Sequence, residues 1–286
     1  MERREGEFCG EGGLRIWYQS WRPEAPRAIV VIAHGVGEHS GRYGNVVNCL
    51  VPKGYAVYAL DHRGHGRSAG RRGHVNRFAE YIIDVGHLID LARAEGPGLP
   101  VFLLGHSLGG EIALAHALER PEGVAGVIAS SPGLGIKLQV PRLKVFLGEL
   151  MSRLVPTFTQ HSGLPANNMS HDPRVVQDYV GDPLVHDLVS ARWYTEMTRT
   201  AREVMANARR LRLPLLVIQS DDDPLIDSQA VRRFFAEAGS ADKTLREYAG
   251  FYHECFNEVE CERPLADLVA WLDAHVPSPA QAGGVE

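Results

Sequence analysis

Short runs of apolar residues alternate along this chain with longer segments in which apolar residues recur at helical spacing. An uninterrupted apolar run such as 28–33 is typical of a strand buried on both faces of a sheet. The pattern predicts strands at 14–21, 28–33, 55–60, 101–104, 124–130, 214–219 and 243–248, and helices at 43–53, 75–94, 110–120, 228–238 and 264–275. This alternation predicts the α/β class, with a mostly parallel central sheet that helices cover on both faces.

The alternation stops at Ser131-Pro132-Gly133, and no apolar run typical of a central strand follows until about residue 212. Helical spacing occurs there instead, at 140–155, 174–179 and 189–207. We therefore expect a core in two parts, residues 1–132 and 213–276, with an inserted helical cap at 133–212. The last ten residues, 277–286, are rich in Pro, Ala and Gly, and we expect them to be disordered.

The most informative stretch is VFLLGHSLGG at 101–110. An apolar run leads into Gly105-His106-Ser107-Leu108-Gly109, and a segment of good helix formers follows. A G-x-S-x-G pattern between a strand and a helix is typical of a nucleophile elbow, a sharp turn that exposes its serine above the sheet. Ser107 is therefore the candidate nucleophile.

The same pattern occurs a second time, at Gly66-Arg67-Ser68-Ala69-Gly70. Here the preceding apolar run ends at residue 60, and the residues that follow do not begin a helix. We therefore interpret Ser68 as a loop residue. For the loop 61–74 around it, which contains Asp61, His62, Arg63 and His65, we favour a structural role in which salt bridges hold the loop in place.

A serine nucleophile needs a general base and an acid that orients the base, and in elbow hydrolases these follow in the order serine, acid, histidine. The loop after the predicted strand 243–248 contains His253, which is the candidate base. The loop after 214–219 offers several acids, namely Asp221, Asp222, Asp223 and Asp227. Asp223 is favoured because Pro224 restrains it to an extended backbone.

An ester hydrolase also needs two donors for the oxyanion of its transition state. The backbone amide of Leu108, directly after the nucleophile, is one candidate. The second is the amide of Val36, in the loop HGVGEH at 34–39, where two glycines let the backbone bend inward. No G-K-[ST] follows these glycines, so a phosphate-binding loop is not indicated.

Composition excludes several other classes of protein. The 286 residues carry a net charge of −5, and their arginines are scattered, so we expect no nucleic-acid partner. The start MERREG lacks a signal-peptide pattern, and no apolar run approaches the roughly 20 residues of a membrane span, so the cytoplasm is the expected location. The 13 histidines and four cysteines show no zinc or redox spacing, and we expect neither a metal nor another cofactor.

Several motifs together resemble the monoacylglycerol lipase and lysophospholipase branch of the α/β-hydrolases. They are HGVGEHSGRY at 34–43, LDHRGHGRS at 60–68, GHSLGG at 105–110, YHE at 252–254 and, in the cap, DPLVH at 182–186. The resemblance covers residues 10 to 275. It implies an α/β-hydrolase fold with Ser107 as nucleophile, His253 as base, and Val36 and Leu108 as oxyanion donors. In the acid loop Ser220 stands where the family has Gly, whereas Asp223 matches the family pattern.

The expected activity is hydrolysis of carboxylic esters, most of all monoacylglycerols, through an acyl-enzyme on Ser107. A general carboxylesterase or a lysophospholipase is the alternative; a perhydrolase or acyltransferase on the same triad is less favoured. A non-catalytic binding protein is disfavoured, because such a protein would be expected to have lost a triad member.

The cap segment 140–155 carries a broad apolar stripe that includes Phe146 and Leu147. One interpretation is a helix packed over the core. The other is that part of the stripe lines an acyl tunnel and touches lipid surfaces.

Overall fold

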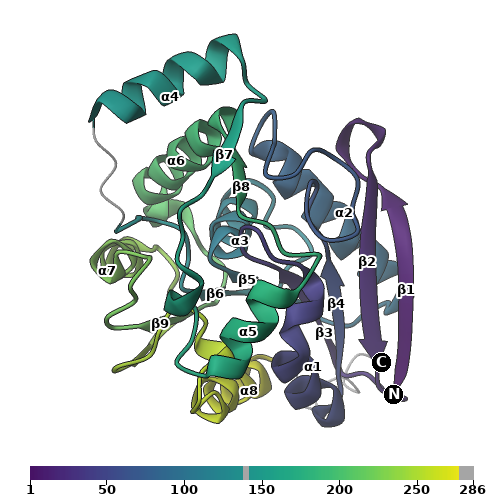
Figure 1. Cartoon of the computed structure of the whole chain (residues 1–286). Coiled ribbons are helices and arrows are strands. Elements are labelled where there is room, and N and C mark those ends of the chain that lie inside the picture. Colours follow the sequence, from purple (N-terminus) through teal and green to yellow (C-terminus); the bar gives the residue numbers. More distant parts are fainter. Residues whose placement is uncertain (138–141, 277–286) are drawn as a thin grey trace.

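The computed structural model describes residues 1–137 and 142–276. For residues 142–145 it describes the backbone only. An eight-stranded sheet forms its centre, in the order β1-β2-β4-β3-β5-β6-β9-β10 (Figure 1). Six neighbouring strands from β4 to β10 are parallel, and β1 and β2 are antiparallel additions at one edge. The strands are β1 Glu2–Cys9, β2 Arg15–Arg22, β3 Ala28–Ala33, β4 Tyr55–Leu60, β5 Val101–His106, β6 Gly126–Ser130, β9 Leu215–Ser220 and β10 Lys243–Tyr248.

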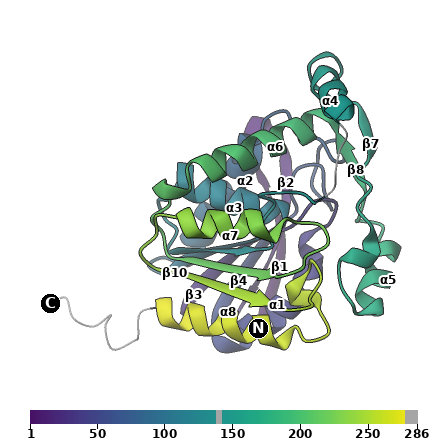
Figure 2. The same cartoon turned by 90° about the vertical axis from the view of Figure 1, so that its left-hand side faces the viewer.

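Helices cover both faces of this sheet, as Figure 2 shows. On one face lie α1 (Gly44–Leu50) and α8 (Glu262–His275), and on the other lie α2 (Ala79–Glu95), α3 (Leu108–Glu119) and α7 (Ser228–Glu237). Strand β3 shows how the sequence makes this possible: Val30 packs in the cluster with α1 and α8, and Val31 packs in the opposite cluster. A strand that is apolar at every position fills both cores at once.

Between β6 and β9 the chain leaves the sheet, and we keep the name cap for residues 133–212. Its described elements are α4 Arg142–Leu154, β7 Thr159–His161, α5 Pro173–Gly181, β8 Leu188–Ser190 and α6 Ala191–Ala206. Strands β7 and β8 pair with each other and form a separate two-stranded sheet. Helix α4 lies at the outer end of the cap beside α6 (Figure 1), where the Ser152 hydroxyl meets the Thr195 hydroxyl at 2.8 Å.

Short 3₁₀ helices complete the described elements: η1 Glu11–Gly13, η2 Ser40–Tyr43, η3 Val51–Lys53, η4 Ala166–Asn168, η5 Ala208–Arg210 and η6 Cys255–Asn257. Within residues 1–137 and 142–276, no helix is both long and apolar enough to cross a membrane. The tail 277–286 and the start of the segment 140–155 lie outside the described residues.

The sequence pattern missed strand β1, which reads ERREGEFC and is mostly exposed. Charged residues occupy most of its positions, as is usual for an edge strand, so it carries no apolar signal. Several predicted helix starts were also displaced. The helices predicted from residues 75 and 189 begin later, at Ala79 and Ala191, and the Ser190 hydroxyl caps the second by accepting from the Trp193 amide. The helices predicted from residues 110 and 264 begin two residues earlier, at Leu108 and Glu262.

Candidate active site

Ser107 occupies a strained turn between β5 and α3. Its backbone has φ 53° and ψ −116°, a conformation that non-glycine residues rarely adopt. The flanking glycines are required by space, because a Cβ at Gly105 would lie 1.9 Å from the Gly109 carbonyl oxygen. A Cβ at Gly109 would lie equally close to the carbonyl oxygen of Ala33 on β3. The two glycines thus let the turn approach the neighbouring strand closely enough to hold its serine at the carboxyl edge of the sheet.

Backbone hydrogen bonds hold this turn. The Ser107 amide donates to Ser130 O at 2.9 Å, and the Gly133 amide donates to Ser107 O at 3.0 Å. Leu108 is the first residue of α3, so its amide has no acceptor within the helix and is available to an oxyanion. The positive end of the helix dipole adds to the same effect.

Val36 borders the same pocket as Leu108, in a loop whose shape is set by its neighbours. The Gly35 amide donates to a carboxylate oxygen of Glu38 at 2.6 Å, and a Cβ at Gly35 would lie 3.4 Å from the Ser107 Cβ. Gly37 has φ 76°, and its carbonyl accepts from the His186 amide of the cap at 2.8 Å. The Val36 peptide is therefore held from both sides, by the core through Glu38 and by the cap through His186.

His253 and Asp223 form a buried pair. His253 Nδ1 lies 2.7 Å from Asp223 Oδ2, and the side chains are 4% and 2% exposed. The other carboxylate oxygen of Asp223 accepts from the amides of Leu225 and Ile226, at 2.8 and 3.0 Å. A carboxylate fixed in this way can orient the imidazole and stabilise the imidazolium.

The other candidate acids have different partners. Asp222 is 88% exposed and pairs with Lys137, Asp221 accepts from the Gly250 amide, and Asp227 caps α7. Ser220, which replaces the family's Gly, donates its hydroxyl to the Phe251 carbonyl and so ties the acid loop to the loop of His253.

The charge of Asp223 stabilises the protonated form of the His253 imidazole. Burial acts to lower the pKa of His253, but the charge of Asp223 and its hydrogen bond raise it overall. Burial acts to raise the pKa of Asp223, and its contact with His253 lowers it overall. Burial and the nearby charge of His253 lower the pKa of His106, whose ring centroid lies 4.7 Å from that of His253, to about 4. His106 is thus neutral at pH 7.

Sequence reasoning missed a polar cluster beside this pair. The Arg42 guanidinium bridges the buried carboxylates of Glu38 and Glu254, at 2.8 and 2.6 Å. Burial acts to raise the pKa of Glu38, but Arg42 and the surrounding donors lower it to about 2. The signal was present in the motif HGVGEHSGRY, and in the Glu that follows His253, but only the fold brings the three residues together.

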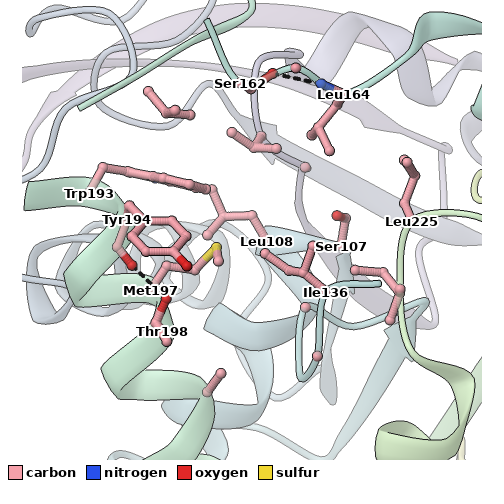
Figure 3. A pocket seen from close by; sticks show the side chains of 18 of the residues that line it. Ser107, Leu108, Ile136, Ser162, Leu164, Trp193, Tyr194, Met197, Thr198 and Leu225 are labelled. Carbon is pink, nitrogen blue, oxygen red and sulfur yellow. Dashed lines mark hydrogen bonds between the residues drawn. The ribbon is translucent and has the colours of Figure 1, made fainter. Parts of the chain in front are cut away.

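One pocket of 1290 Å³ is lined by Ser107, Val36, Leu108 and His253 together. Figure 3 shows α6 on one side of it, with Trp193, Tyr194 and Met197, and Leu164 and Leu225 on other sides. The polar residues Glu38, His106 and Glu254 also border it. Of the two residues named in the apolar stripe, Leu147 borders the pocket, whereas Phe146 is 62% exposed and lies outside the lining.

Ser68 lies elsewhere and is tied down. Its hydroxyl donates to the Asp61 carbonyl at 2.5 Å and accepts from the Trp17 amide at 2.8 Å. The structural interpretation of the loop 61–74 is also supported, because the Arg63 side chain pairs with both Glu80 and Asp84 at 2.7 Å. Among residues 1–137 and 142–276, no group of three or more potential ligands is arranged to hold a metal ion.

A serine on such a turn, at the carboxyl edge of a mostly parallel sheet, places the chain in the class of α/β-hydrolases. Residues 24–260 match the model of the family described as serine aminopeptidase, S33, and the chain belongs to that family.

Individual relatives are similar over nearly the whole chain. A monoacylglycerol lipase of Mycolicibacterium smegmatis is 37% identical, with 96% of this chain and 98% of the relative covered. Phospholipase YtpA of Bacillus subtilis is 36% identical, with 90% and 99% covered. The crystal structure of the Paleococcus ferrophilus monoacylglycerol lipase superposes with a TM-score of 0.82 at 34% identity, and 96% and 100% of the two chains are covered. The predictions of an α/β-hydrolase fold and of a carboxylic-ester hydrolase are confirmed.

The contact between His253 and Asp223 predicts how kcat/KM depends on pH. A general base must be neutral to accept the serine proton, and the pKa of His253 is raised above its usual value of about 6.5. We therefore expect kcat/KM on a soluble ester to rise with pH through a midpoint above 6.5. In Asp223→Asn, kcat should fall by roughly three to four orders of magnitude. The midpoint should also move down, because the largest charge that opposes the effect of burial on the pKa of His253 is then removed.

Asp222→Asn is the matched control, since this neighbouring carboxylate is exposed and pairs only with Lys137 among its described contacts. It should keep the rate and the pH midpoint of the unaltered chain. A midpoint below 6.5 in the unaltered chain, or equal losses in the two variants, would contradict the assignment of the acid.

Proposed function

We propose that this chain hydrolyses monoacylglycerols to glycerol and free fatty acid, with Ser107, His253 and Asp223 as its catalytic triad. Ser107 Oγ attacks the ester carbonyl and passes its proton to His253, while Asp223 stabilises the imidazolium. The amides of Val36 and Leu108 stabilise the oxyanion. The imidazolium then gives its proton to the leaving glycerol oxygen, and water activated by His253 hydrolyses the acyl-enzyme in the same manner.

The observation that carries this proposal is the mixed apolar and polar lining of the pocket at Ser107. Apolar side chains such as Trp193, Met197 and Leu164 offer room for an acyl chain. The polar residues Glu38, His106 and Glu254 lie in the same cavity and suit an alcohol with further hydroxyl groups. A monoacylglycerol has these two halves joined at the bond that Ser107 would attack.

The relatives support the proposal and also supply a second candidate. Two of them carry the name monoacylglycerol lipase, at 37% and 34% identity, which supports the glycerol ester. The Bacillus subtilis relative is named a phospholipase at 36% identity, which favours a lysophospholipid as the alternative. Glu38 and Glu254 beside the pocket carry two negative charges against the single positive charge of Arg42, and this excess of negative charge disfavours a phosphate-bearing leaving group.

We also propose that α4 touches lipid surfaces during turnover. Its outer positions Phe146, Leu150 and Leu154 are 62%, 42% and 69% exposed, and Phe158 just beyond it is 48% exposed. On the same helix Leu147, Gly148 and Met151 border the pocket. An apolar surface continuous with the acyl pocket suits a substrate that leaves a micelle or membrane.

A panel of esters tests the substrate. Each buried methylene contributes up to about 0.8 kcal/mol, or about fourfold in kcat/KM. We expect kcat/KM to climb from acetyl to medium-chain monoacylglycerols and to exceed that for the lysophosphatidylcholine of equal chain length. In Ser107→Ala the activity on all of them should fall by several orders of magnitude. A preference for acetyl esters would contradict the lipase assignment, and a preference for the lysophospholipid would favour the second candidate.

Substitution on the outer face of α4 tests the lipid contact. Phe146→Ser combined with Leu154→Ser should lower the rate on micellar monoacylglycerol several-fold more than the rate on soluble p-nitrophenyl acetate, because neither residue lines the pocket. Val180→Ser is the control, since Val180 is 70% exposed on α5. Equal losses on both substrates, or an equal effect of Val180→Ser, would contradict a lipid-contacting role for α4.

A further inference from the structure

The loop that carries His253 is held by the cap as well as by the core. The His253 amide donates to Asn168 O at 3.3 Å, and the Glu254 amide donates to Met169 O at 2.8 Å. One residue further along the cap, the Ser170 hydroxyl donates to Asn257 O at 2.8 Å. The cap segment 168–171 therefore runs beside the loop 252–258 and pairs with its backbone.

Glu258 contacts both the loop 252–258 and the cap segment 168–171. It is 5% exposed, and its carboxylate accepts from the Tyr252 amide at 2.7 Å and from the Val259 amide at 3.1 Å. It also accepts from the cap, through the His171 amide at 3.3 Å and His171 Nδ1 at 2.9 Å. The His171 ring stacks on Tyr252, with ring centroids 3.6 Å apart. One buried carboxylate thus joins the cap to the residue that immediately precedes His253.

The same cap segment also borders the substrate cavity. Met169 lines the pocket, and its carbonyl is the acceptor for the Glu254 amide. Glu258 itself is absent from the lining of the pocket and contacts none of the groups that react. Any effect it has on turnover must therefore pass through the position of His253.

We propose that Glu258 is a positioning residue that couples the cap to the catalytic base, so that His253 keeps its contact with Asp223 only while the segment 168–171 is docked on the loop. This inference rests on the proposed role of His253 as the base. A buried carboxylate that accepts several hydrogen bonds is costly to disturb, because removal of one partner leaves a buried polar group unsatisfied. A displacement of about 1 Å in a catalytic group can cost 10²-fold in rate.

Glu258→Gln tests the coupling, with Glu260→Gln as the matched control. Glu260 is two residues away, 58% exposed, and pairs with Arg263. On a soluble ester we expect Glu258→Gln to lower kcat by roughly 10- to 100-fold with KM within about twofold. The pH midpoint of kcat/KM should also move down, because the contact that raises the pKa of His253 is loosened. Glu260→Gln should change neither quantity.

His171 provides the second pair of variants, which carries the test if Glu258→Gln fails to fold. His171→Ala removes the Nδ1 contact and should lower kcat and the pH midpoint together. His171→Asn places an amide nitrogen near the position of Nδ1 and should restore both in part. If Glu258→Gln folds, the double variant Glu258→Gln/His171→Ala should have nearly the same kcat and pH midpoint as Glu258→Gln alone, as expected for two partners in one interaction.

An unchanged kcat and pH midpoint in Glu258→Gln would overturn the coupling, as would a kcat loss in His171→Ala that His171→Asn does not relieve. A fall in kcat without any movement of the pH midpoint would likewise assign Glu258 to stability alone. Failure of the proposed function is distinguishable, because it would appear as hydrolysis that persists in Ser107→Ala, whatever Glu258→Gln does.

Discussion

Ser107 stands at a backbone conformation that costs of order 1–3 kcal/mol, and much of the surrounding structure supports it. The turn can exist only because Gly105 and Gly109 leave no Cβ between β5, α3 and the end of β3. Hydrogen bonds from Ser107 to Ser130 and from Gly133 to Ser107 offset the strain. The same close approach brings the Leu108 amide and the Val36 loop to one place, so the site follows from a packing constraint between backbones.

Two groups of buried ionisable side chains lie beside this turn. Asp223 faces His253, and Arg42 stands between Glu38 and Glu254. Each carboxylate has a cation or an ionisable partner within hydrogen-bond distance, which is the condition under which buried charges are tolerated. Glu38 belongs both to the Arg42 cluster and to the loop of Val36, since it also accepts from the Gly35 amide. One side chain therefore links the charged cluster to that loop.

The parallel strands and the elbow could be predicted from the sequence because both have short-range signals. Apolar runs such as 28–33 mark strands buried on two faces, and G-x-S-x-G at 105–109 marks the turn. The choice of Asp223 among neighbouring aspartates rested on Pro224 and on the family pattern, and the structure places that residue against His253. These inferences needed only local sequence together with the order of the elements.

The parts that could not be predicted depend on long-range contacts or on weak patterns. Strand β1 has too few apolar residues to be recognised, and β7 and β8 are three residues each. The bridge from Arg42 to Glu254 spans 212 positions, and the contact of His171 with Glu258 spans 87. No spacing rule relates such residues. Phe146 shared an apolar stripe with Leu147, and only the packing of α4 on α6 shows that one points out and the other lines the pocket.

If the strained turn makes Ser107 the nucleophile, a reagent that reacts with activated serines should modify Ser107. The chain would be treated with a fluorophosphonate and digested, and the modified peptide would be identified by mass spectrometry. We expect one label on Ser107, which is lost in Ser107→Ala, retained in Ser68→Ala, and formed much more slowly in Asp223→Asn. A label on Ser68, or undiminished labelling of Ser107→Ala, would contradict the assignment of Ser107.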